Sequence, residues 1–520
     1  MSEKSEGQSN LLADLKRVAS TSGLYAAATV LQRGLSFILL PIYTRFLMPA
    51  EYGTLELLTG LSAILFGLLL LGMPSALTKV FHRDCETEDQ RRRVLATAIL
   101  IDLPVLLFGA AVLFIVAEPL GFWLIGEHGQ ATIVRLTVAT VVTSSLIAIV
   151  LSSFRAREQA IAFAIVNFAQ FGLGMLMNIA LVVWFEYGIY GVLWGNLVAS
   201  ILALPIGLAI ARRDTSWEFD RNLVKPLVNF GVLVIPTAIT GWVITMADRY
   251  VLRFYDTLET VAVYSVGYKI GMIMQMGLVW PFQLAWPAVA YSISKRAGHE
   301  KTYARVLTYL TFALVLGVLG LSLLSRAGLD EFAGQSYSRA YEVVPLVALA
   351  YAFAGVQFCL SPGIHIAGKT KYLPLFSAVG TVINLGMNFL LVPEYGMLGA
   401  TWATVVSYFF LAAATCILSQ KCHPVPWEYG RLLRIVGVGA VVYAIGVFTD
   451  LGDSLFAGLT WQFFLATGAY PALLLATGFL HPGERRMVAD LFNRLAPWRV
   501  GAPPPPVDLG PDDDGHPQGG

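Results

Sequence analysis

Charged residues are scarce in this 520-residue chain. Asp, Glu, Lys and Arg together make up 13% of it, whereas soluble globular domains carry about 25%. Hydrophobic residues reach 56%, and the mean hydropathy is +0.67. So few charges cannot cover a water-exposed surface, which excludes an ordinary soluble protein. The composition indicates an all-α protein that crosses a membrane many times.

Cysteine is also scarce. The four cysteines show no CxxC pair and no regular spacing, which excludes a disulfide framework and a cysteine zinc site. We therefore expect no metal and no cofactor. A formal net charge of +1 gives no indication of a nucleic-acid partner, and none is expected. The cysteines are Cys85, Cys359, Cys416 and Cys422.

Long polar loops are missing as well. Apolar windows of about 20 residues, the length of a bilayer-spanning helix, follow one another closely. The longest outer loop covers roughly residues 327–340, so there is no room for an extramembrane catalytic domain and we do not expect an enzyme. About fourteen transmembrane helices are predicted, near 22–44, 54–77, 94–117, 131–153, 160–185, 189–210, 230–252, 260–291, 304–325, 342–366, 374–393, 396–418, 432–449 and 456–480.

The basic residues orient these spans. If the N-terminus is cytoplasmic, most of the 35 Lys and Arg residues fall in cytoplasmic segments. Only Arg326 and Arg339 lie clearly in a loop on the other side. Positively charged loops stay in the cytoplasm, so we expect both termini there.

One segment of the sequence occurs twice. Residues 186–194 (EYGIYGVLW) reappear as residues 394–402 (EYGMLGATW), an offset of 208 residues (394 minus 186). The same offset pairs Arg45 with Arg253 and Glu51 with Glu259. Six predicted spans separate the copies, and an even number returns the chain to its starting side, so the repeat predicts two parallel six-helix lobes with a pathway between them.

The repeat divides the chain into six parts, two of which are the lobes. The expected parts are a cytoplasmic N-terminal segment (1–21), an N-lobe (22–211), a cytoplasmic linker (212–229), a C-lobe (230–419), two accessory helices (432–480) and a cytoplasmic, partly disordered tail (481–520).

Several short motifs resemble a known family. They are Gly23–Tyr25 and Leu40–Leu47, followed by Pro49–Gly53, then Ala247–Leu252 and Val263–Lys269. Together they resemble the polysaccharide-flippase branch of the multidrug/oligosaccharidyl-lipid/polysaccharide (MOP) exporter superfamily, over roughly residues 20–420. The resemblance implies a MATE-like fold that moves an undecaprenyl-pyrophosphate-linked oligosaccharide, a repeat unit of a polysaccharide, O-antigen or exopolysaccharide, across a bacterial inner membrane. It implies inner-membrane lipids and polysaccharide polymerase or export machinery as partners.

Such a cargo is negatively charged at its pyrophosphate, so its carrier needs cations at mid-membrane depth. Arg33 lies twelve residues inside Arg45 on the first predicted span, about 18 Å along a helix, which puts it near the bilayer centre. We expect Arg33 to contact the pyrophosphate. The structural alternative is a buried pair with an acid such as Glu56 or Asp102.

Lys269 is the second candidate cation. It lies between Gly267 and Gly271, a spacing typical of a helix face that packs closely on a neighbour. Two positions along a helix turn by about 200°, so Lys269 points away from that face, toward a lumen. The alternative is a lysine that reaches the outer headgroups.

Arg249, favoured by the family resemblance, is the third candidate cation. Adjacent helical residues diverge by about 100°, so we expect that Asp248 and Arg249 do not simply pair and that one of them points inward. A rim charge near the headgroups is the alternative. Asp102 and His365 are further titratable groups within predicted spans, and each either binds a coupling proton or makes a helix-stabilising hydrogen bond.

Amide side chains in the spans, among them Asn167, Gln170 and Asn178, either bind sugar or join helices. The sequence leaves two other cargoes open. A peptidoglycan-precursor (lipid II) flippase would also have fourteen spans and a cationic lumen. A cation-coupled multidrug exporter would hold cationic drugs with acids, for which Asp102 is thin support.

Overall fold

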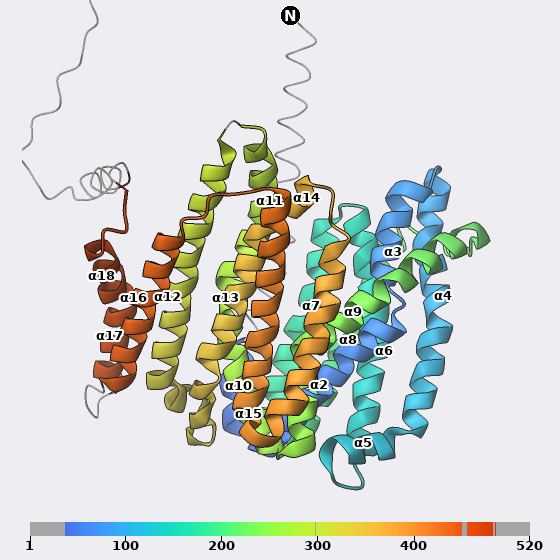
Figure 1. The fold of residues 1–520 in the computed structure, drawn as a ribbon. Coiled ribbons are helices and arrows are strands. Elements are labelled where there is room, and N and C mark those ends of the chain that lie inside the picture. Colours follow the sequence, from blue (N-terminus) through green and yellow to red (C-terminus); the bar gives the residue numbers. More distant parts are fainter. Residues whose placement is uncertain (1–36, 297, 450–454, 482–483, 485–520) are drawn as a thin grey trace, which may run out of the picture.

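Helices form every regular element that the structure describes. The computed structural model describes residues 37–296, 298–449, 455–481 and 484. Within these ranges, eleven helices are long and apolar enough to cross a membrane. They stand side by side in one bundle (Figure 1). The prediction of an all-α, multi-pass membrane protein is confirmed.

The first half of the bundle begins with the helix Phe37–Phe46, the described end of the first predicted span. The rest of that span, including Arg33, lies outside the described residues. The elements that follow are α2 (Pro49–Leu69), α3 (Met73–Lys79), the π-helix η1 (Val80–Asp84), α4 (Glu88–Ile115), α5 (Ala117–Ile125), α6 (Ala131–Ala156), α7 (Ala160–Ile179), the π-helix η2 (Ala180–Trp184) and α8 (Gly188–Ala211).

The second half of the described chain is also built of helices. Its elements are α9 (Arg221–Tyr255), α10 (Leu258–Gly271), the π-helix η3 (Gln275–Val279), α11 (Trp280–Ser294), α12 (His299–Ala333), the 3₁₀ helix η4 (Gln335–Glu342), α13 (Val344–Leu360), α14 (Pro362–Ile366) and α15 (Tyr372–Cys422). The accessory elements are α16 (Tyr429–Phe448), α17 (Leu455–Phe464), the π-helix η5 (Leu465–Ala469) and α18 (Tyr470–Ala476).

Several helix boundaries differ from the sequence prediction, among them those of α9 and α15. Helix α9 begins at Arg221, inside the expected linker 212–229, because the Asp220 side chain accepts a hydrogen bond from the Asn222 amide and caps the helix earlier. Helix α15 covers two predicted spans, 374–393 and 396–418. It folds back on itself at Gly396, where φ is +53° and ψ is −129° (Figure 1).

The repeated motif marks equivalent turns. Gly188, 208 positions before Gly396, has a φ of +54° and joins η2 to α8. Glycine lacks the Cβ that opposes positive φ, so it suits both turns. The repeat-related Arg45 and Arg253 also play equivalent roles, because each donates to a carbonyl of the other half of the chain. Arg45 donates to Glu331 and Arg253 to Ile125, both at 2.8 Å.

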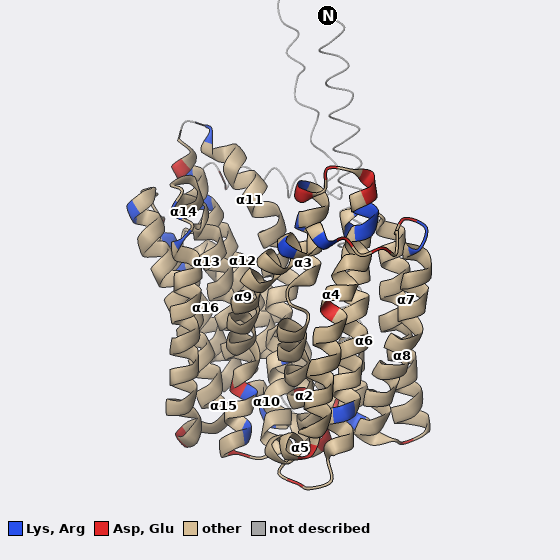
Figure 2. Cartoon of the chain, turned by 90° about the vertical axis from the view of Figure 1, so that its right-hand side faces the viewer, with Lys and Arg blue, Asp and Glu red and all other residues tan. Residues whose placement is uncertain are grey.

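Helix α2 joins the two halves, because it packs against α9 and α10 as well as α6. A Cβ at Gly53 would overlap the Leu258 carbonyl, so only glycine allows α2 and α10 to come this close. Tyr250 on α9 donates to the Leu57 carbonyl of α2 at 2.7 Å. Charged residues gather mainly at the two ends of the bundle, which leaves its middle largely uncharged (Figure 2).

Candidate functional site

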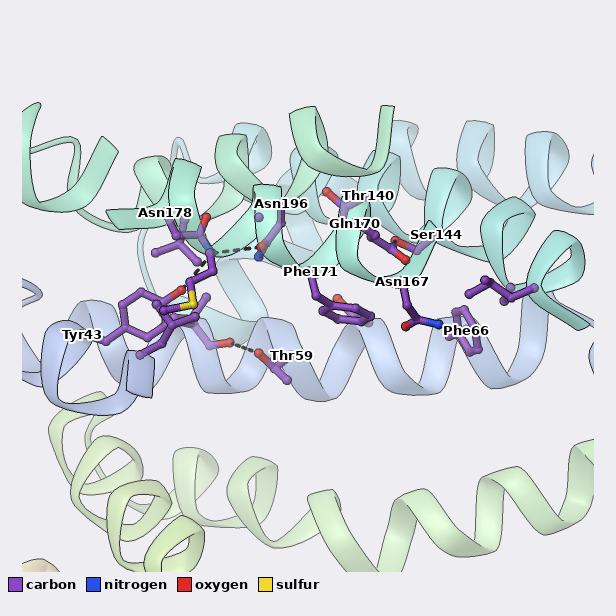
Figure 3. Close-up of a pocket in the computed structure, with 18 of the residues that line it drawn as sticks. Tyr43, Thr59, Phe66, Thr140, Ser144, Asn167, Gln170, Phe171, Asn178 and Asn196 are labelled. Carbon is purple, nitrogen blue, oxygen red and sulfur yellow. Dashed lines mark hydrogen bonds between the residues drawn. The ribbon is translucent and has the colours of Figure 1, made fainter. Parts of the chain in front are cut away.

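A cavity of about 680 Å³ lies between α2 on one side and α6, α7 and α8 on the other (Figure 3). Its middle is lined by hydroxyl and amide side chains, interspersed with apolar and aromatic ones. The polar residues that Figure 3 labels are Tyr43, Thr59, Thr140, Ser144, Asn167, Gln170, Asn178 and Asn196. In a membrane-spanning chain, a lining of this kind suits a ligand with many hydroxyl groups.

The amides of this cavity also hold its walls together. Asn178 on α7 donates to the Tyr43 hydroxyl at 2.9 Å and to the Asn196 Oδ1 on α8 at 3.0 Å (Figure 3). Gln170 donates to the Ser144 hydroxyl on α6 at 3.1 Å. These amides therefore join helices, one of the two roles that the sequence left open, and they also line the cavity.

Lys269 from α10 and Glu56 from α2 lie at one end of the cavity lining. The Lys269 Nζ is 2.5 Å from the Glu56 Oε1 and donates to the Tyr52 hydroxyl at 2.9 Å. The Lys269 side chain is 30% exposed, whereas that of Glu56 is 3% exposed. Lysine is thus the accessible member of this pair. Thr257 caps the start of α10 by accepting from the Thr260 amide, which fixes the helix that carries Lys269.

Behind this pair lies a second, fully buried one. The Arg249 Nη1 is 3.1 Å from the Asp248 Oδ1, and the Arg249 Nε is 3.8 Å from the Glu56 Oε2. The Tyr264 hydroxyl donates to Asp248, and the Arg249 guanidinium lies 4.5 Å from the centre of the Tyr268 ring. The two ion pairs form one cluster of two acids, Glu56 and Asp248, and two bases, Lys269 and Arg249. When all four side chains are ionised, the cluster has no net charge.

The expectation that Asp248 and Arg249 do not pair is wrong. The arginine side chain is long enough to turn back along its own helix, where Nη1 reaches both the Asp248 carboxylate and the Thr245 carbonyl. Both side chains are at most 2% exposed, and Arg249 is not part of the cavity lining. Arg249 therefore lies on the buried side of Glu56, within ion-pair distance of its carboxylate, and does not face the cavity.

The glycine pair around Lys269 packs as predicted. A Cβ at Gly267 would lie 2.5 Å from the Ala340 carbonyl, and one at Gly271 would lie 2.6 Å from the Val347 Cβ. Because this face of α10 lies against η4 and α13, Lys269 is turned toward α2 and the cavity.

Asp102 and His365 are not part of this cluster. Asp102 is fully buried on α4, and neither of its carboxylate oxygens has a hydrogen-bond partner among the described residues. His365 is exposed near the end of the short helix α14. Arg33 lies outside the described residues, so its position relative to the cluster remains a sequence prediction.

Arg155 also lines the cavity, although it is not among the site residues predicted from the sequence. It is fifteen residues beyond Thr140 on α6, about 22 Å along the helix, in the last turn. Its guanidinium lies 5.8 Å from the centre of the Phe163 ring. Glu56 was considered only as a partner for Arg33. Glu56 is the only acid in α2 after Glu51, and an acid within an apolar span indicates a functional or paired residue.

Comparisons with known proteins identify the family of this chain. The chain matches the family described as "Polysaccharide biosynthesis protein" over residues 18–293, more than half of its length. It is 23% identical over 355 residues to the succinoglycan biosynthesis transport protein ExoT of Rhizobium meliloti, covering 68% of this chain and 70% of that protein.

Two solved structures share the fold. One is lipid II flippase MurJ in an inward closed conformation, with a TM-score of 0.69, 16% identity, and coverage of 88% of this chain and 98% of that one. The other is a multidrug resistance MATE family transporter of the MOP superfamily in an inward-facing conformation, with a TM-score of 0.58, 14% identity, and coverage of 78% and 96%. The chain belongs to the polysaccharide biosynthesis protein family and has the fold of the MOP-superfamily transporters.

Proposed function

We propose that this protein is a flippase that moves an undecaprenyl-pyrophosphate-linked oligosaccharide across a bacterial inner membrane. The observation that carries the proposal is the cavity at α2, α6, α7 and α8, which combines a hydroxyl and amide lining with a cationic side chain, Lys269, in its wall. The hydroxyl and amide lining suits a sugar, and the cationic side chain suits a pyrophosphate. Family membership and the transport role named for ExoT support the same class of cargo.

The sugar moiety would occupy the polar middle of the cavity. A volume of about 680 Å³ lies within the range of sites that enclose small-molecule ligands. Asn167 and Gln170 face this space and offer donors and acceptors to hydroxyl groups (Figure 3). The prenyl chain, which has no polar group to satisfy, would remain among the lipid tails.

The pyrophosphate would engage Lys269 and, from the sequence, Arg33. Glu56 already neutralises Lys269, so an incoming phosphate has to replace this carboxylate as the partner of the amine. Arg249 is too deeply buried to meet the cargo and serves as a positioning residue for Glu56. In this mechanism, cargo binding loosens a contact between α2 and α10, which come from the two proposed lobes, and rocking of the lobes exposes the cavity to one side at a time.

Mass spectrometry of polyprenyl-linked lipids tests this proposal. Cells that lack the protein should accumulate one lipid-linked glycan, and wild-type protein should relieve the accumulation. Lys269→Ala should fail to relieve it, while the control Lys371→Ala, which changes an exposed lysine between α14 and α15, should succeed. An unchanged lipid profile in the deletion would overturn the proposal.

The peptidoglycan-precursor flippase is the second candidate, favoured by the fold shared with lipid II flippase MurJ. The same experiment separates the two, because accumulation of a peptide-bearing disaccharide lipid would identify that cargo. A multidrug exporter would instead leave the lipids unchanged and raise the sensitivity of the deletion strain to cationic drugs.

A further inference from the structure

Two histidines lie next to one another at an end of the second half of the bundle. His299 begins α12, and His423 follows the last residue of α15. Figure 1 shows these helix ends at the same end of the bundle. Their Nε2 atoms are 3.0 Å apart, although the residues are 124 positions apart in the chain. Glu300 adds a carboxylate oxygen 3.7 Å from the His299 Nε2.

The hydrogen bonding of His299 prepares its ring for a metal ion. Its Nδ1 is 2.8 Å from the Arg296 carbonyl oxygen, which can only accept, so Nδ1 carries the hydrogen. In the neutral ring, this leaves a lone pair on Nε2, which accepts a hydrogen bond from the His423 Nε2–H at 3.0 Å. Metal binding requires His423 to shift this hydrogen to its Nδ1, so that both Nε2 atoms offer lone pairs. Metal-binding histidines usually donate their other ring N–H to a carbonyl or carboxylate in this way, which fixes the tautomer and the ring orientation.

Tyr303 holds both imidazoles. Its ring meets those of His299 and His423 edge-on, with centroid distances of 5.7 and 6.0 Å, and its hydroxyl donates to the Ala290 carbonyl at 2.7 Å. The two imidazole planes differ by 7°. The donor atoms are thus supported by a buried side chain that is itself anchored, as a preformed site requires.

We propose that His299, Glu300 and His423 form a site for a divalent transition-metal ion of the zinc type. Their three donor atoms lie within 4.8 Å of one another. Two nitrogens each about 2.1 Å from a tetrahedral zinc ion are separated by about 3.4 Å, close to the observed spacing. Two imidazoles and one carboxylate form a recognised zinc donor set that leaves the fourth position for water. The side chains of His299 and Glu300 are 16% and 36% exposed, which gives an ion access from solvent.

The bound ion would fasten the start of α12 to the turn after α15. Binding to the folded chain alone raises its stability, so the metal acts as a clamp on one end of the second half of the bundle. The site lies outside the cavity lining and does not rest on the proposed function. The site was not expected from the sequence, because neither histidine has another ligand at a familiar metal-site spacing along the chain.

Zinc binding to the purified full-length protein tests the site. The protein, produced without a polyhistidine tag and treated with a chelator, is titrated with Zn²⁺ by calorimetry, and the bound metal is counted by mass spectrometry. We expect one ion per chain and a rise in the thermal unfolding midpoint on Zn²⁺ addition. His299→Ala and His423→Ala should each lose more than tenfold in affinity together with this rise. His128→Ala, which removes an exposed histidine from the loop between α5 and α6, should behave as wild type.

Two further measurements keep the result decisive if a histidine variant misfolds. Glu300→Gln keeps the size of the side chain and should still weaken Zn²⁺ binding about tenfold. Co²⁺ in the wild-type protein should give the visible absorption of a tetrahedral nitrogen and oxygen site, and Zn²⁺ should abolish it. Absence of Zn²⁺ binding to wild type, or unchanged affinity in the folded variants, would overturn the proposal.

Discussion

Lys269 and Glu56 form an ion pair across 213 positions of sequence, and of the two only the lysine side chain is substantially exposed. In the proposed mechanism, a cargo anion competes with the Glu56 carboxylate for this amine. Glu56→Gln should raise the amount of lipid-linked glycan that co-purifies with the protein, by about tenfold if the lost competition is about 1.4 kcal/mol. Mass spectrometry of lipids extracted from the purified variant measures this change.

Lys269→Ala should move the same measurement in the opposite direction, because the cavity then loses the cation beside Glu56, while Arg155 stays in its lining and Glu56 keeps Arg249 as a partner. Lys269→Arg should retain part of the glycan, since it keeps the charge. Equal lipid retention in Glu56→Gln and Lys269→Ala would show that the pair does not meet the cargo.

Arg249 should matter for stability more than for cargo contact. Arg249→Ala leaves Asp248 without its cation and removes the contact behind Glu56, and breaking such a buried pair costs about 3–5 kcal/mol. We expect a clear fall in the thermal unfolding midpoint of the detergent-purified protein. Asp248→Asn should reduce the stability less than Arg249→Ala does. Arg249 keeps Glu56 as an ion-pair partner, and the asparagine side-chain oxygen can still accept a hydrogen bond from the Tyr264 hydroxyl. A normally stable Arg249→Ala protein that binds no glycan would instead place Arg249 at the cargo.

The helices were predictable because runs of apolar residues long enough to cross a bilayer are a property of the local sequence. The face of α10 was predictable for the same reason, since the spacing of Gly267 and Gly271 fixes where Lys269 points. The partner of Lys269 was not, because no local pattern links it to Glu56 in the other half of the chain. The pairing of Asp248 with Arg249 was missed because the angle between adjacent Cβ atoms ignores the reach of a long side chain.

The repeated turns give a prediction of strain. Gly188 and Gly396 have φ of +54° and +53°, which side chains with a Cβ rarely adopt. Gly188→Ala and Gly396→Ala should each destabilise the protein by about 1–2 kcal/mol, measured as a fall in the thermal unfolding midpoint. The matched control is Gly386→Ala within α15, where no atom lies within 4 Å of the added Cβ. It should be stabilising by up to about 1 kcal/mol, because alanine favours the helix. A neutral effect at both turn glycines would contradict the predicted strain, and a loss of stability at only one of them would contradict the equivalence of the two turns.

Cysteine labelling tests whether the segments that contain Cys85 and Cys422 lie on the cytoplasmic side of the membrane, as the sequence predicts. Cys422 ends α15 and is half-buried, whereas Cys85, after η1, is 5% exposed, and burial raises the pKa of its thiol to about 11. In single-cysteine variants, a membrane-impermeant maleimide should label Cys422 in inverted vesicles and leave it unlabelled in intact spheroplasts.

Because the thiolate is the reactive form, Cys85 should label slowly at pH 7.5. Its rate should keep rising with pH up to about 11, where the thiol is half ionised, and denaturant should remove the protection. Labelling of Cys422 from the outside of spheroplasts would reverse the proposed orientation, and fast labelling of native Cys85 at pH 7.5 would contradict its burial.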